Sequence, residues 1–182
     1  CARTGARLRV APVDEDGQVL LSEYEKLLSS RTKIAALTHV SNALGTVVPA
    51  ARMAEMARRF GARVLVDGAQ AVSHMKVDVQ ALDSDFYVFS GHKIFVPTGI
   101  GVLYGKGELL ESMPPYQGGG NMISDVTFEK ARYKSPPHRF EAGTGNIAGA
   151  IALGSALDYV TSIGLDSISA YEHGLLEYAR EA

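Results

Sequence analysis

Cysteine is nearly absent from the sequence, because Cys1 is the only one among 182 residues. A single cysteine excludes an internal disulfide and a metal site built from several thiolates. We therefore predict no metal site. Cys1 itself is interpreted as a small apolar residue and not as a reactive thiol.

Long apolar runs and a strong charge of one sign are also missing. No run is long enough to span a bilayer, and the chain does not open with the pattern of a signal peptide. The net charge of -2 gives no reason to expect nucleic acid or an anionic membrane as a partner. We expect a cytoplasmic protein, and its 46% hydrophobic residues are enough for a substantial core.

Strand and helix patterns alternate along most of the chain. Short apolar runs predict strands buried on both faces at residues 34–40, 64–66 and 86–89. Further strands are predicted at residues 8–12 and 99–104. Helical periodicity predicts helices at residues 22–30, 49–60, 109–113 and 146–163, and from residue 166 onward. Residues 115–137 resemble a long irregular loop. The alternation predicts an α/β fold, a three-layer α-β-α arrangement with a mostly parallel sheet and right-handed crossovers.

Several residues mark the expected helix ends. Ser22 and Glu25 form a capping-box pattern at the first helix, and Gly61 and Gly164 are expected to end helices. Asp166 is expected to cap the last helix. In the helix at residues 146–163, we expect an inward face made of Ile147, Ala150, Ile151, Leu157 and Val160.

Polar residues follow two of the predicted strands directly. Asp67 and Gln70 come after residues 64–66, and Ser90, His92 and Lys93 come after residues 86–89. In open α/β sheets, ligands bind outside the carboxyl ends of the strands. The sequence therefore predicts that these five side chains converge on one crevice.

These residue types suit a site for pyridoxal phosphate. Lys93 could form a Schiff base, and Asp67 could hold the protonated ring nitrogen. Gln70 could donate to the ring hydroxyl, while Ser90 and His92 could bind the phosphate. Simpler interpretations stay open on spacing alone: Asp67 as a helix N-cap, His92 as a satisfied, partly buried histidine, and Lys93 as a solvated surface charge.

Six motifs, in chain order, resemble those of the class V aminotransferases, a group of fold-type I enzymes. The resemblance covers nearly the whole chain and is greatest to the cysteine desulfurases also credited with selenocysteine lyase activity. The motifs are His39–Asn42, Asp67–Gln70, Ser90–Lys93, Pro97–Gly101, Gly118–Gly120 and Arg139–Thr144.

The resemblance implies a homodimeric pyridoxal-phosphate enzyme. Such an enzyme takes sulfur from L-cysteine as a persulfide, or selenium from L-selenocysteine, and leaves L-alanine. It implies a role in sulfur mobilisation for iron-sulfur clusters, with a sulfur-acceptor protein as a further partner. Another class V enzyme, such as a selenocysteine lyase or an epimerase, and a non-catalytic domain of the same fold are the alternatives.

Carried over by motif, Lys93 resembles the Schiff-base lysine of the family and Asp67 the partner of the ring nitrogen. Gln70 resembles the partner of the ring oxygen, and Ser90 and His92 resemble phosphate ligands. These roles agree with those expected from the residue types.

Two further residues gain a role only from the resemblance. Asn42 matches an asparagine near the substrate carboxylate, and Thr144 matches a threonine that reaches the phosphate in the neighbouring subunit. Thr144 could instead cap the following helix. The sequence departs from the family pattern at Val96, where glycine is usual, and at Gly145, where proline is usual.

The resemblance also implies that the chain is the central part of a longer protein. Residues 1–165 match the central part of the cofactor-binding large domain, and residues 166–182 the start of the helix leading to a small C-terminal domain. The family's phosphate-cradling loop, ring-stacking histidine, persulfide cysteine and carboxylate-binding arginine would lie outside these residues. Cys1 does not match the catalytic cysteine, so we expect no turnover from this chain alone.

Overall fold

The computed structural model describes residues 4–182, so the prediction for Cys1 lies outside the described residues. The chain forms two compact units, the first ending at Val88 and the second spanning Phe89–Ala182. Each unit is described by itself. The predicted division after residue 165 stays a prediction.

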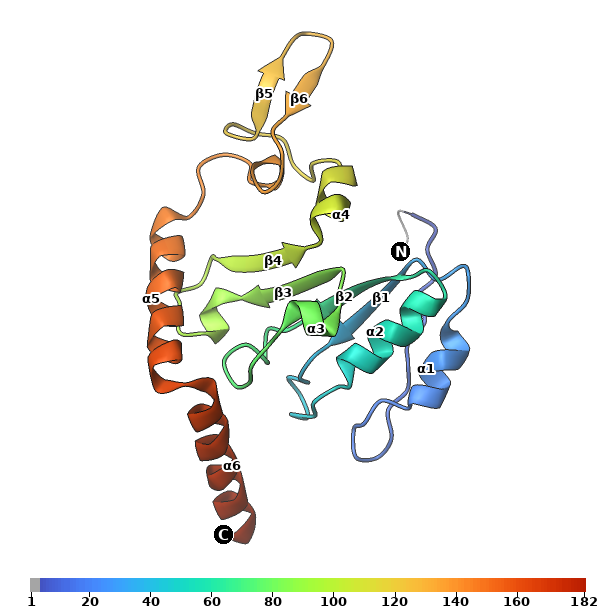
Figure 1. Ribbon diagram of the computed structural model, residues 1–182, viewed down its shortest axis with the longest axis vertical. Coiled ribbons are helices and arrows are strands. Elements are labelled where there is room, and N and C mark those ends of the chain that lie inside the picture. The colour runs from blue at the N-terminus through green and yellow to red at the C-terminus, as the bar shows by residue number, and fades with distance from the viewer. Residues whose placement is uncertain (1–3) are drawn as a thin grey trace. The chain divides into compact units, whose positions relative to one another are not determined.

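Three parallel strands form the sheet of the first unit, and the last of them continues into the second unit (Figure 1). They are β1 (Ile34–Thr38), β2 (Arg63–Asp67) and β3 (Phe86–Ser90). Thr38 pairs with Asp67, and Asp67 pairs with Val88. The carboxyl ends of the three strands therefore lie at one edge of the sheet.

One face of this sheet is covered by the helix α2 (Ala50–Arg59), whose Met53, Ala54 and Ala57 are almost fully buried. Val64 and Val66 of β2 are fully buried on the covered face. Residues on the other face of β1 are exposed, so the prediction that this strand is buried on both faces is wrong. That prediction relied on an unbroken apolar run, which does not show whether both faces are covered.

Two shorter helices complete the first unit. In α1 (Leu21–Leu27) the buried Tyr24 donates its hydroxyl hydrogen bond to the carbonyl of Met53, at 3.2 Å. The N-cap of α1 is Leu20, without a side-chain cap, so the predicted cap at Ser22 is wrong. In contrast, α3 (Val79–Leu82) is capped by Asp78, whose side chain accepts from two backbone amides.

The predicted first strand, at residues 8–12, is not present. Its apolar residues Leu8 and Val10 are exposed, and the structure gives this part of the chain only an isolated bridge between Val13 and Val19. An apolar alternation makes a strand only when a partner strand lies beside it.

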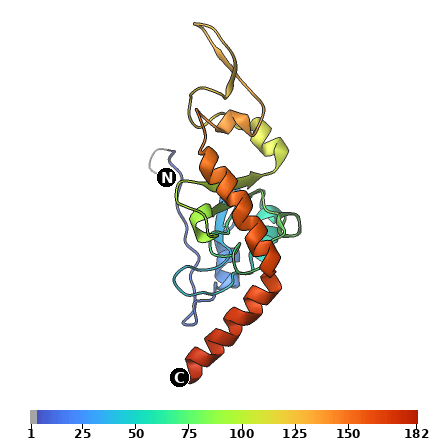
Figure 2. The same cartoon turned by 90° about the vertical axis from the view of Figure 1, so that its left-hand side faces the viewer.

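After the end of β3, the second unit contains β4 (Gly101–Gly105) and α4 (Gly107–Ser112). An antiparallel hairpin follows, made of β5 (Ile123–Val126) and β6 (Ala131–Tyr133). The hairpin occupies part of the region predicted to be irregular, so that prediction is wrong there. Figure 2 shows the hairpin as a narrow two-stranded element.

Two helices of the second unit meet at Gly164. They are α5 (Ile147–Ile163) and α6 (Leu165–Glu181). Gly164 ends α5, as predicted, with a φ of 87° that favours glycine. It also serves as the N-cap of α6, so Asp166 lies in the first turn of that helix and is not its cap.

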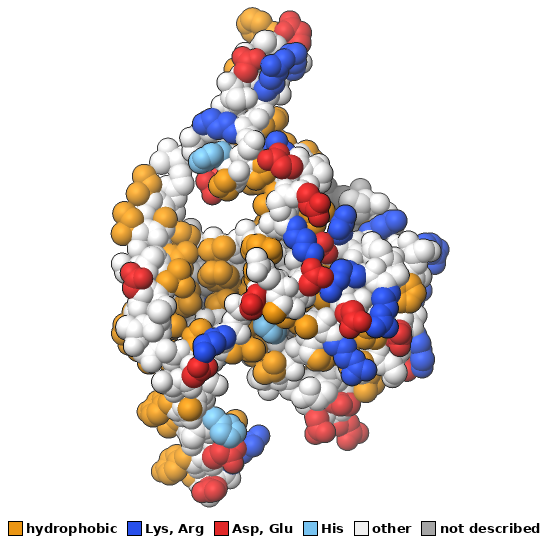
Figure 3. All heavy atoms as spheres, viewed as in Figure 1, with side chains coloured by type: hydrophobic (Ala, Val, Ile, Leu, Met, Phe, Trp, Pro, Cys, Tyr) orange, Lys and Arg blue, Asp and Glu red, His pale blue; other side chains and the backbone are white. Residues whose placement is uncertain are grey.

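The inward face predicted for α5 is wrong except at Val160. The buried residues of this helix are Gly149, Leu153, Ala156 and Val160, whereas Ile147 and Ile151 are exposed. Hydrophobic side chains are visible along α5 in Figure 3.

In the described part of the chain, no single helix is long and apolar enough to cross a membrane. Among the described helices, only α5 and α6 taken together reach the length and apolar composition of a membrane span, and they are bent by 71° where they meet.

The structure confirms the predicted mixed α/β class with a mostly parallel sheet. The strands predicted at residues 34–40, 64–66, 86–89 and 99–104 correspond to β1, β2, β3 and β4. The second helical layer of the predicted three-layer arrangement stays a prediction.

Candidate functional site

Asp67 is the last residue of β2, and its side chain is exposed. Its Oδ1 accepts a hydrogen bond from the amide of Ala69 at 2.9 Å, and its carbonyl accepts from the amide of His39 at 2.8 Å. Turn residues follow it, and the next described helix begins only at Val79. The interpretation of Asp67 as a helix N-cap is therefore wrong, and the carboxylate is available at the edge of the sheet.

Asn42 and Gln70 are brought together by the loops that follow β1 and β2. The side-chain amide of Gln70 donates a hydrogen bond to Oδ1 of Asn42. Two of the residues predicted for the site thus meet, although they are separated by 28 positions in the sequence. Their contact places amide groups beside the strand end that carries Asp67.

Beneath this edge, on the covered face of the sheet, lies a buried pair that the sequence reasoning missed. Nδ1 of His39 lies 3.0 Å from the hydroxyl of Tyr87, and the two rings meet edge to face. Burial lowers the pKa of His39. Burial, and then the charge of Asp67, raise the pKa of Tyr87. The hydrogen bond therefore joins a neutral imidazole and a protonated phenol.

Gly68 is the third residue of this region that was missed. Its amide donates to the carbonyl of Val88 at 2.8 Å, and a Cβ at this position would collide with the phenol ring of Tyr87. The signal in the sequence was a glycine directly after a strand, where close backbone approach is common.

Lys93 lies in the second unit, at the end of a tight turn. The turn is the short helix η1 (Gly91–Lys93), which follows β3 directly. The amide of Gly91 donates to the carbonyl of Ile100 at 2.9 Å, and Ile94, after Lys93, is almost fully buried. The turn is anchored on both sides, so the main chain that carries Lys93 is held in place.

Within residues 4–182, the side chains of Ser90, His92, Lys93 and Thr144 make no hydrogen bond or ion pair. His92 is exposed, so its interpretation as a satisfied, partly buried histidine is wrong. Lys93 is half-buried. These side chains offer an ammonium group, two hydroxyl groups and an imidazole, none of which has a partner in the described chain. Groups of these kinds can bind an anion such as a phosphate.

Asn146, not Thr144, caps α5. The Oδ1 of Asn146 accepts from the amide of Gly149 at 2.9 Å, and its Nδ2 donates to the carbonyl of Gly99 at 3.2 Å. The interpretation of Thr144 as the helix cap is therefore wrong. Thr144 is exposed, two residues before this N-cap, and its hydroxyl is available for another partner.

Arg139 anchors the segment that leads to Thr144. Its guanidinium donates to the carbonyl of Lys134 at 3.1 Å and to the carbonyl of Glu111 at 2.6 Å, and forms an ion pair with the Glu111 carboxylate at 3.2 Å. Although Arg139 belongs to a quoted motif, the sequence reasoning gave it no role. The structure assigns it the positioning of this segment.

The two departures from the family pattern are accommodated. Val96 is buried, and it is not among the described non-glycine residues with positive φ, which are Asp83, Phe95 and Asn121. A Cβ at Gly145 would meet nothing within 4 Å, and its φ lies outside the range that favours glycine. Neither position removes a functional group.

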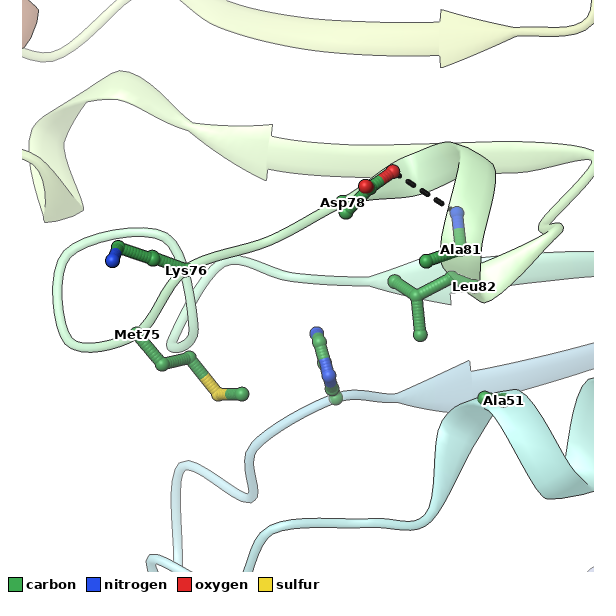
Figure 4. Close-up of a pocket in the computed structure, with 7 residues that line it drawn as sticks. Ala51, Met75, Lys76, Asp78, Ala81 and Leu82 are labelled. Carbon is green, nitrogen blue, oxygen red and sulfur yellow. Dashed lines mark hydrogen bonds between the residues drawn. The ribbon is translucent and has the colours of Figure 1, made fainter.

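A pocket of about 270 Å³ lies in the first unit and is lined by residues including His39, Ala51, Met75 and Leu82 (Figure 4). None of the residues predicted for the site lines it. In the described residues, no three histidine, cysteine or acidic side chains are placed to hold a metal ion.

The groups in each unit are of the kinds that pyridoxal phosphate requires. In the first unit, the exposed carboxylate of Asp67 suits a protonated ring nitrogen, and one of its oxygens is already oriented by Ala69. In the second unit, Lys93 suits covalent attachment, and Ser90 and His92 suit a phosphate. The residues present thus fit this cofactor chemically.

The profile of the family described as Aminotransferase class-V matches residues 1–182. The chain is 68% identical over 175 residues to a cysteine desulfurase of Synechococcus elongatus, covering 96% of this chain and 28% of that protein. It is 56% identical to a cysteine desulfurase of Cronobacter sakazakii, covering 98% of this chain and 44% of that protein.

Among solved structures, the cysteine desulfurase CsdA of Escherichia coli resembles the chain with a TM-score of 0.95 at 40% identity. The match covers 99% of this chain and 45% of that one. The chain therefore spans less than half the length of each of these three proteins.

Proposed function

Because the chain belongs to the aminotransferase class-V family, we propose that it is the central part of the cofactor-binding domain of a cysteine desulfurase. The identity of 68% to a protein of that name carries this proposal. The activity would convert L-cysteine to L-alanine and leave the sulfur as a persulfide on the complete protein.

The domain assignment follows from the same similarity. Residues 1–165 would belong to the large domain, and residues 166–182 would begin the helix toward a small C-terminal domain. The persulfide cysteine and the arginine that binds the substrate carboxylate would then come from outside this chain. The chain alone would be inactive.

The family depends on pyridoxal phosphate. When bound, this cofactor supplies an electron sink for bond breaking in an amino-acid substrate. Lys93 would hold the cofactor covalently through Nζ, and the anchored turn holds the main chain that carries this side chain. Asp67 would keep a proton on the ring nitrogen, since its charge favours the protonated form.

The remaining residues would orient the cofactor and the substrate. Ser90 and His92 would bind the phosphate through side chains that have no partner among the described residues. Gln70 would bind the ring oxygen. Asn42, which Gln70 holds by a hydrogen bond, would lie near the substrate carboxylate.

Thr144 would act across a dimer interface. Its hydroxyl is exposed and does not cap α5, because Asn146 does so. This hydroxyl would bind the phosphate in the neighbouring subunit of a symmetric homodimer. A sulfur-acceptor protein, a role in iron-sulfur cluster assembly and a cytoplasmic location belong to the same proposal.

The experiment is an assay of the complete protein for L-alanine formed from L-cysteine, with and without added pyridoxal phosphate. Asp67→Asn should lower turnover more than cofactor affinity, because a neutral partner no longer favours the protonated ring. The loss of such a charge-assisted bond should cost about 1.5–3 kcal/mol.

The matched control is Asp78→Asn, which changes another exposed carboxylate of the same unit while keeping a side chain that can cap α3. It should leave turnover unchanged. If the wild-type protein takes up no cofactor, a non-catalytic domain is favoured instead. If it binds the cofactor but forms no L-alanine, another class V activity is favoured.

A further inference from the structure

We infer that the buried pair of His39 and Tyr87 is a positioning element, which holds the ends of β1 and β2 so that Asp67 keeps its place in the site. The inference rests on the proposed function, because Asp67 is assigned to the cofactor there. Neither residue of the pair is itself placed against cofactor or substrate.

The strand register separates the pair from the site. Leu37, Val66 and Tyr87 are register partners, and all three are buried on the covered face. Thr38 and Asp67 form the next register pair, and their side chains are exposed. The pair therefore lies on the face opposite to Asp67, and its packing contacts reach Asp67 through the main chain.

Tyr87 reaches from β3 to the ends of both other strands. Its phenol occupies the place of a side chain at Gly68, the residue after Asp67. Its hydroxyl bonds His39, the residue after β1, at 3.0 Å. One side chain thus contacts the residue that follows β1 and the residue that follows β2.

The main chain transmits this position to Asp67. The amide of His39 donates to the carbonyl of Asp67, and the amide of Gly68 donates to the carbonyl of Val88, both at 2.8 Å. A shift of the phenol would disturb the residues that hold Asp67 on both sides.

The hydroxyl is what fixes the phenol in place. A pocket of about 270 Å³ borders His39, so the pair is not packed tightly on every side. Without the hydrogen bond, the imidazole could move into this space, and the ring of Tyr87 could follow it. Burial keeps the imidazole neutral by lowering the pKa of His39, so the bond is present at neutral pH.

The test compares Tyr87→Phe with Tyr24→Phe in the complete protein. Both variants remove one buried hydroxyl from the first unit, but Tyr24 bonds the carbonyl of Met53 in α2, not a strand end. The amides of His39 and Gly68 are followed by hydrogen exchange in the protein without cofactor. Cofactor affinity and the absorbance of the bound cofactor are then measured.

Tyr87→Phe should speed exchange at His39 and Gly68, weaken cofactor binding roughly two- to tenfold and shift the absorbance of the bound cofactor. Tyr24→Phe should lose a similar amount of global stability without these local changes. His39→Gln, which keeps a group able to accept the bond, should retain more cofactor affinity than His39→Leu.

Equal exchange, affinity and absorbance in the two tyrosine variants would overturn the inference while leaving the proposed function intact. Equal affinity in the two His39 variants would also overturn it. A wild-type protein that binds no cofactor would instead overturn the proposed function, and the exchange data would still report whether the pair holds the strand ends.

Discussion

The phenol of Tyr87 fills the space that a side chain at Gly68 would need. Tyr87 is buried on β3, and Gly68 directly follows the last residue of β2. The glycine is therefore required by its neighbour and not by a positive φ. The contact joins β3 to the residue that follows the end of β2, next to Asp67 in the chain.

The first prediction is that Gly68→Ala destabilises the protein by roughly 1–3 kcal/mol, since a Cβ forces Tyr87 out of its place. Urea unfolding measures the change. The control is Gly154→Ala in α5, where an added Cβ would meet nothing within 4 Å. It should stabilise the helix by about 0.5–1 kcal/mol. A Gly68→Ala protein as stable as the wild type would contradict the close contact.

The second prediction concerns the start of α5. Asn146→Ala should cost about 1 kcal/mol, because it removes the side-chain cap and the bond to Gly99. Thr144→Ala should leave the free energy of unfolding nearly unchanged, since Thr144 caps nothing. Thermal unfolding of both variants without cofactor is the measurement, and the reverse order of stability would show that Thr144 is the cap.

The third prediction tests Thr144 across the proposed dimer. Mixed dimers are prepared from one Thr144→Ala subunit and one Lys93→Ala subunit. The surviving Lys93 then meets an intact Thr144 from its neighbour, so that site should bind cofactor normally. The control is the dimer with Thr144→Ala in both subunits, which should bind weakly. Weak binding in the mixed dimer would show that Thr144 serves its own subunit.

The fourth prediction is a loss of stability in mild acid caused by His39. Burial lowers the pKa of this residue in the folded protein from 6.5, the ordinary value it regains on unfolding. Between these two pKa values, the unfolded state binds more protons than the folded state. The contribution of neutral His39 to the free energy of unfolding is therefore fully present above the unfolded pKa and is lost as the pH falls through the folded pKa.

The measurement is urea unfolding between about pH 7.5 and about pH 5.5. The wild type should lose more stability over this range than His39→Gln, which cannot titrate. Parallel pH profiles for the two proteins would show that His39 does not cause the loss.

Much of the fold was predictable because strand order and turn signals are local. The runs that became β1 and β2 alternate with the helical pattern of α2, and Gly61 and Gly164 end their helices at positive φ. The polar residues after β2 and β3 could be chosen because parallel strands place their carboxyl ends at one edge.

Other features depended on partners that a local pattern does not reveal. The apolar residues 8–12 lack a partner strand in the described chain, so no strand forms there. The helix α5 is apolar around most of its surface, so its periodicity could not select the face that carries Leu153 and Ala156. The weak alternation in β5 and β6 was hidden among charged residues.

The candidate site also combines residues that the local sequence indicates with residues whose role depends on distant parts of the chain. Asp67 and Lys93 were predicted from residue type and position, whereas the pair of His39 and Tyr87 required the register of three strands. Asn146 was missed as a cap because Thr144, two residues earlier, is an equally suitable residue type.

The most direct test of the central claim is to locate the cofactor on the chain. The complete protein is loaded with pyridoxal phosphate, reduced with borohydride and mapped by peptide mass spectrometry. The modification should lie on Lys93 alone, and Lys93→Ala should lose it while keeping the fold. A reduced cofactor on Lys76 or Lys106, or none on Lys93, would contradict the claim.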